Sequence, residues 1–165
     1  MTTVTQVAPK LGISEGRLRW GSALMALAGV GLFGNGLVFY IRTLIGGGFE
    51  LGIGAEQIGT TVAEIQALSM GLHHYITHLH LGIAAFLLGS GIAIAALSWI
   101  GVRAGLRWSW WTAVLSFILI IGLGLPAHFP WDLDPVQHLG GAYLAIVLFV
   151  TGGVLTAPVA RRVDG

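Results

Sequence analysis

Long apolar runs with almost no charge are the feature of this sequence that most restricts its possible folds. Four runs are long enough to cross a bilayer, because a helix of about 20 residues spans the roughly 30 Å hydrocarbon core. They cover residues 20–45, 80–100, 108–127 and 138–157. Only 9% of the residues are charged, against about 25% in a soluble domain. The sequence therefore predicts an all-α fold, a bundle of four transmembrane helices.

The basic residues predict the orientation of this bundle. Seven of the eight fall on one side of the predicted spans, and Arg42 is the exception. The seven are Lys10, Arg17, Arg19, Arg103, Arg107, Arg161 and Arg162. Because basic residues collect on the cytoplasmic side, we expect both termini in the cytoplasm and a multi-pass protein of the plasma (inner) membrane. The predicted divisions are a cytoplasmic segment 1–19, a membrane domain 20–158 and a cytoplasmic tail 159–165.

Charge and cysteine content exclude several classes of function. The net charge of +1 excludes electrostatic capture of nucleic acid as a main task. With no cysteine, the chain has no disulfides, thiolate metal sites or cysteine nucleophiles. Glycines recur within the predicted helices, for example in GVGLFGNG (29–36). They indicate close helix packing or room for a flat ligand.

The histidines are all predicted on the side opposite the basic residues. Counting 1.5 Å per residue brings one histidine from each of three helices to a single layer: His80, His128 and His138. His73, His74 and His78 lie above this layer if residues 60–70, which have helical spacing, extend the second helix outward. At 100° per residue, His73 and His80 lie within about 20° of each other, and His74 and His78 form a second stripe.

Six histidines on one side of a small bundle indicate a bound ion or cofactor, although a single interfacial histidine would need no ligand. Imidazole without cysteine suits haem iron, copper, zinc or non-haem iron. Haem b is the leading interpretation, because it needs only one or two imidazoles and an apolar slot. A histidine and carboxylate metal site is the second, and a proton-linked histidine relay is the third. The carboxylates on the same side are Glu50, Glu64, Asp132 and Asp134.

Two short motifs resemble known membrane proteins. GGFE (47–50) followed by HLG (80–82), in a chain of this length with four predicted helices, resembles the styrene oxide isomerase family. The string THLHLGIAAFLLGSG (77–91) also resembles the histidine-bearing helix starts of haem–copper oxidase relatives. Where the isomerase family has Asn six residues after its histidine, this chain has Phe86, and residues 108–127 lack the family's Tyr.

The isomerase resemblance implies a homo-oligomer that binds haem b, with His80 as the axial ligand. The ferric iron would act as a Lewis acid and convert a small hydrophobic epoxide, arriving from the bilayer lipids, into a carbonyl compound without net redox change. Tyr143 and Asn35 are the candidate catalytic residues. The candidate cofactor ligands are His80, His78, His138 and His128.

Two other functions stay open at this point. The first is a b-type cytochrome subunit that exchanges electrons with quinone. The second is a copper, zinc or non-haem iron enzyme, or an accessory subunit, whose metal ligands come from the histidines. The candidate metal ligands are His73, His74, His78, His80, His128 and His138.

Overall fold

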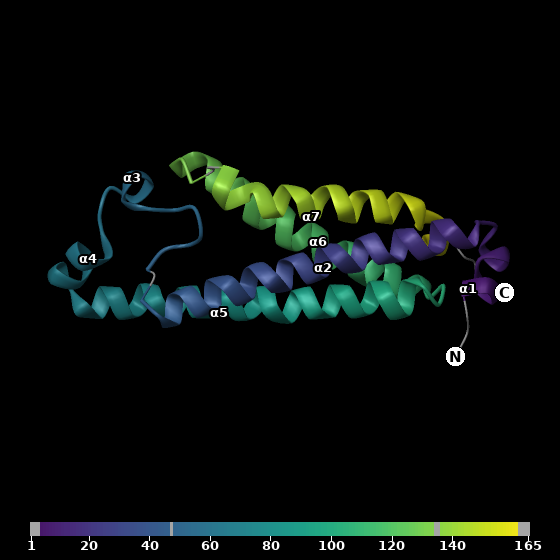
Figure 1. Ribbon diagram of the computed structural model, residues 1–165, viewed down its shortest axis with the longest axis horizontal. Helices are drawn as coiled ribbons and strands as arrows, with labels where there is room; N and C mark the ends of the chain where they lie inside the picture. The colour runs from purple at the N-terminus through teal and green to yellow at the C-terminus, as the bar shows by residue number, and fades with distance from the viewer. Residues whose placement is uncertain (1–3, 47, 134–135, 162–165) are drawn as a thin grey trace.

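The computed structural model describes residues 4–46, 48–133 and 136–161, which contain helices and no strand. Four long helices form a bundle (Figure 1): α2 (Glu15–Leu44), α5 (Met70–Ala96), α6 (Arg107–Gly124) and α7 (Val136–Leu155). Each, with its direct continuation, is long and apolar enough to cross a membrane. The predicted all-α, four-helix fold is therefore confirmed. Gly47, Asp134 and Arg162, which the sequence interpretation uses, lie outside the described residues.

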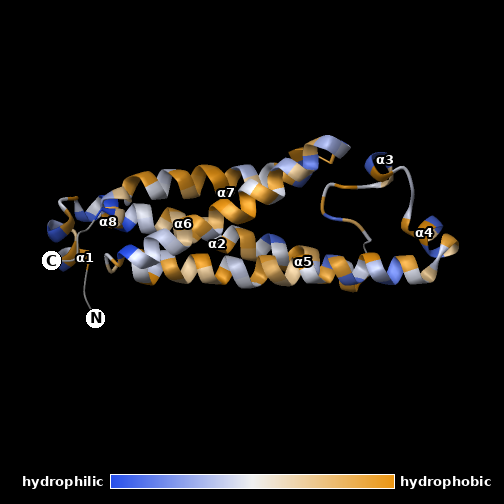
Figure 2. Cartoon of the chain, turned by 180° about the vertical axis from the view of Figure 1, so that it is seen from behind, coloured by the Kyte–Doolittle hydropathy of each residue, from blue (hydrophilic) through white to orange (hydrophobic). Residues whose placement is uncertain are grey.

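Short helices lie at both ends of the bundle. Helices α1 (Val4–Val7) and α8 (Ala157–Ala160) lie at one end, and α3 (Ala55–Ile58) and α4 (Val62–Leu68) lie at the other (Figure 1). Apolar residues dominate the long helices between these ends (Figure 2). Which end faces the cytoplasm stays a prediction from the charges. The two ends are called here the α1/α8 end and the α3/α4 end.

Two helices begin earlier than the apolar runs predict. Helix α2 begins at Glu15 rather than at residue 20, because the Ser14 side chain accepts a hydrogen bond from the Arg17 N–H at 3.3 Å and caps the helix. Helix α5 begins at Met70, capped in the same way by Ser69. The predicted outward extension over 60–70 is broken at Ser69, whose backbone is extended, and residues Val62–Leu68 form the separate helix α4. His80 consequently lies inside α5, not at its beginning.

Helix α2 lies at the centre of the bundle and packs along both α5 and α7. Glycines make the contacts close: Gly29 faces Gly91 of α5, and Gly21 faces Gly152 of α7 and Thr156, the residue that follows α7. Helix α6 joins α7 through the stacked rings of Phe117 and Phe149, whose centroids are 4.0 Å apart. Toward the α3/α4 end, the four long helices surround a pocket.

Candidate functional site

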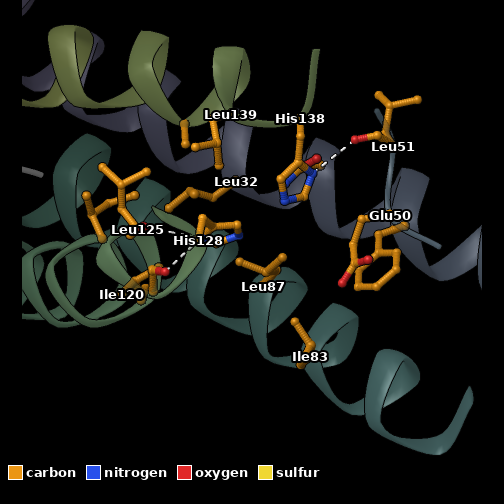
Figure 3. Close-up of a pocket in the computed structure, with 15 residues that line it drawn as sticks. Leu32, Glu50, Leu51, Ile83, Leu87, Ile120, Leu125, His128, His138 and Leu139 are labelled. Carbon is orange, nitrogen blue, oxygen red and sulfur yellow. Dashed lines mark hydrogen bonds between the residues drawn. The ribbon is translucent and has the colours of Figure 1, made fainter. Parts of the chain in front are cut away.

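A pocket of about 400 Å³ opens toward the α3/α4 end of the bundle, between the four long helices and the segment after α2. Its walls are largely apolar, and leucine and isoleucine side chains supply most of them. Four polar side chains also line it: Asn35 from α2, Glu50 from the loop, His128 and His138 (Figure 3). An apolar cavity with a few polar groups at one end is typical of a small-molecule site.

His128 reaches the pocket because α6 changes geometry at its end. After Gly124 the chain continues as a 3-10 segment, Leu125–Trp131, in which Pro126 and Pro130 have no N–H group for α-helical bonds. The Nδ1 atom of His128 lies 2.9 Å from the Gly124 carbonyl oxygen and 3.2 Å from that of Leu125. A carbonyl oxygen only accepts hydrogen bonds, so Nδ1 carries the proton and Nε2 keeps its lone pair.

His138, in the first turn of α7, is oriented by a backbone carbonyl in the same way. Its Nδ1 donates to the Leu51 oxygen at 3.0 Å, across 87 residues of sequence. The two imidazole rings lie beside each other (Figure 3), with centroids 5.0 Å apart and planes inclined by 46°. Within the described part of the chain, no group hydrogen-bonds to Nε2 of either ring. The site therefore presents two neighbouring rings, each of which, as a neutral imidazole, has an Nε2 lone pair that no described group uses.

The loop that carries Leu51 depends on Gly52. This residue has φ +83°, a left-handed conformation that favours glycine. A Cβ atom on it would lie 2.6 Å from the His138 backbone nitrogen. The loop can therefore lie against the start of α7 only with glycine at this position.

Glu50 connects the pocket to His80. The His80 Nε2 atom lies 3.7 Å from a Glu50 carboxylate oxygen, and the His80 ring packs on Phe39 with centroids 5.2 Å apart. His80 itself does not line the pocket. Its Nδ1 atom is buried and has no hydrogen-bond partner among the described residues. A haem bound through the Nε2 atom of His80 would need free space next to that atom. Within a single chain, Glu50 lies there instead.

The other three histidines lie apart from the pocket. His73 and His80 are partly buried whereas His74 and His78 are exposed, as the two helical stripes predict. His73 contacts Gln66 of α4, with 3.3 Å between the Nε2 atoms of the two side chains. No three His, Asp or Glu side chains of the described residues form a group suited to one metal ion. The expected layer of His80, His128 and His138 is thus divided into the pair His128 and His138 and, apart from it, His80 with Glu50. His73, which was expected above the layer, contacts Gln66.

The remaining candidate residues are also separated by the fold. Asn35 lines the pocket, but Tyr143 is exposed and does not line it. Among the carboxylates expected on this side, only Glu50 is a described residue that lines the pocket. Glu64 caps α4, and Asp132 is exposed in the loop before α7. Asp134 lies outside the described residues. The sequence interpretation missed the Leu51 carbonyl and Gly52. The glycines of this loop were the only sequence feature that could have indicated its role, because a backbone carbonyl that accepts a hydrogen bond has no characteristic sequence motif.

Comparisons of this chain with protein families, with curated proteins and with solved structures found no match.

Proposed function

We propose that this protein binds a transition-metal ion through Nε2 of His128 and Nε2 of His138 in the membrane, next to a pocket for a small hydrophobic molecule. Glu50 lines the same pocket, and its negative charge would partly balance the charge of the ion. The observation that carries this proposal is the pair of neighbouring rings whose Nδ1 atoms are both bonded to backbone carbonyls. Metal-ligating histidines nearly always donate their second ring N–H to such an oxygen.

The spacing of the two rings agrees with a shared ion. At Zn–N distances of about 2.0–2.1 Å, two imidazoles on one tetrahedral ion have ring centroids about 5 Å apart. The observed separation is 5.0 Å. Two imidazoles leave further coordination positions open, and water or a substrate oxygen can take them.

The ligand set favours zinc, copper or non-haem iron, because imidazole and carboxylate suit these ions and the chain has no cysteine. Such an ion supplies Lewis-acid polarisation of an oxygen atom of a bound molecule. The apolar walls hold the hydrophobic part of that molecule, and Asn35 offers a further hydrogen-bonding group in the pocket. The proposed function is therefore metal-dependent chemistry on, or recognition of, a small apolar compound that enters from the bilayer.

Metal titration of the purified, chelator-treated protein tests the proposal. We expect about one zinc ion per chain, as for a single mononuclear site. His128→Ala and His138→Ala should each lower the affinity at least about tenfold, since changing even the groups that orient a ligand costs about 10–100-fold. His78→Ala is the matched control, because His78 is an exposed histidine at the same end of the bundle. An equal loss in His78→Ala, or no binding by the unmodified protein, contradicts the proposal.

The haem b interpretations stay predictions, and the same purified protein tests them. A Soret band that His80→Ala abolishes and His128→Ala leaves intact favours the haem isomerase reading. A low-spin bis-imidazole spectrum with reversible reduction favours the cytochrome reading. Either spectrum would replace the metal site proposed here.

A further inference from the structure

A second hollow lies on the outside of the bundle, toward the α1/α8 end, in the groove between α2 and α5. It has a volume of about 440 Å³ and is lined almost entirely by apolar atoms. Small side chains such as the buried Ala26 and the exposed Ala96 line it on the apolar face called here the floor, together with Trp99 and Ile100. Because these helices have the length and composition of membrane spans, the groove opens toward lipid.

Arg103 is held at the end of this groove. Its guanidinium carbon lies 3.6 Å from the centroid of the Trp99 ring. Its Nε atom donates to the Ser22 hydroxyl at 3.3 Å, and a terminal nitrogen donates to the Arg19 carbonyl oxygen at 3.4 Å. The stacking and both hydrogen bonds hold the guanidinium against α2, next to the apolar floor.

The positive charge at this position has no carboxylate partner among the described residues. Burial lowers the pKa of Arg103, and the nearby positive charge of Arg19 lowers it further. Among residues 4–46, 48–133 and 136–161, no carboxylate forms an ion pair with either arginine. Two arginines close enough to influence each other's charge, without a carboxylate partner among the described residues, favour binding of an anion from outside the chain.

We propose that this groove binds one anionic phospholipid, with an acyl chain along the apolar floor and the phosphate at Arg103 and Arg19. The dimensions agree with a lipid. Val30 also lines the groove, and the eleven helical steps from Arg19 to Val30 rise by about 16 Å, close to half of the roughly 30 Å hydrocarbon core. Trp99 would lie between the acyl chain and the headgroup of this lipid, the depth at which interfacial tryptophans are found.

Native mass spectrometry of the full, delipidated chain with added phosphatidylglycerol or phosphatidylcholine tests this site. We expect preferential binding of phosphatidylglycerol, and Arg103→Gln should lower its affinity about fivefold, the effect of one basic residue near an anionic lipid. Arg107→Gln is the charge-matched control, because Arg107 is exposed at the same end, whereas Arg103 is the arginine that stacks on the groove residue Trp99. It should leave the affinity unchanged.

A second variant tests the groove without altering the arginines. Ala96→Leu fills the floor and should reduce binding, whereas Ala85→Leu, at an exposed position of α5 outside the groove, should not. This pair also decides the question if Arg103→Gln does not fold. Equal binding of both lipids, equal losses in Arg103→Gln and Arg107→Gln, or full displacement of the lipid by inorganic phosphate would overturn the proposal.

Discussion

Gly29 of α2 and Gly91 of α5 face each other where the two helices are in closest contact. A Cβ atom on Gly29 would lie 2.8 Å from the Gly91 carbonyl oxygen, and one on Gly91 would lie 2.7 Å from that of Gly29. Real Cβ atoms do not approach backbone this closely. Helices α2 and α5 line the pocket at one end and the proposed lipid groove at the other. Their close packing therefore requires glycine at both positions.

Gly91→Ala should destabilise the bundle, because the new methyl group meets backbone atoms that cannot rotate away. We expect a loss of about 1–3 kcal/mol, the usual cost of overpacking, measured by thermal unfolding in detergent. Gly89→Ala is the matched control, since nothing lies within 4 Å of its added Cβ and alanine favours helix by about 1 kcal/mol. Equal effects of the two substitutions would contradict the close contact.

Gly52→Ala should weaken metal binding without touching a proposed ligand. The substitution clashes with the backbone of His138 and displaces the Leu51 carbonyl that orients the ring, so we expect about a tenfold lower zinc affinity. Gly59→Ala has the same conformational strain, with φ +73°, but no atom within 4 Å. If both variants bind zinc equally, the Leu51 carbonyl does not set the orientation of His138.

Glu50→Gln tests the carboxylate of the site. It removes the charge that faces His80 at 3.7 Å and lines the pocket. We expect zinc affinity to fall several-fold, because a negative charge that lines the same pocket as the two imidazoles is lost. Glu56→Gln removes the same charge from an exposed position on α3 and should leave zinc affinity as it is. Unchanged affinity in Glu50→Gln would leave the two imidazoles as the only protein ligands.

Thr156→Val should destabilise the opposite end of the bundle. The fully buried Thr156 hydroxyl accepts a hydrogen bond from the Trp110 indole N–H at 3.0 Å. Valine has a similar shape but leaves that N–H without a partner, which costs about 1–3 kcal/mol. Thr112→Val, at an exposed position bonded only to its own helix, should be nearly neutral in the same unfolding measurement.

Acid should release the cap of α4. Hydrogen bonds from the Thr61 backbone N–H and hydroxyl, and from Thr60, hold the pKa of Glu64 below its ordinary value of 4.5. Because the pKa is lower in the folded state, the cap stabilises α4 above pH 4.5, and this stabilisation is lost as the pH falls through the lowered pKa. Carbon-13 NMR titration of the Glu64 carboxyl measures this.

Thr61→Val is the control for that titration. It removes the hydroxyl but keeps the backbone N–H, so the Glu64 pKa should move part of the way back toward 4.5. A Glu64 pKa at its ordinary value in the unmodified protein would show that the cap does not form in solution.

The sequence alone determined the four spans and the residues at each end of the bundle. It could do so because the bilayer requires length and apolarity within each segment, and these properties are local. It also separated His73 and His80 from His74 and His78, because helical periodicity is local too.

Only the tertiary structure decided which histidines meet. His128 and His138 are brought together by the 3-10 segment after α6 and by a carbonyl 87 residues away from His138. His80 is directed to Glu50 instead. The depth of a residue in a membrane follows from counting along one helix, but the direction of its side chain depends on how that helix is rotated and what packs against it. Those contacts are made between segments distant in the chain, and no pattern within a single segment specifies them.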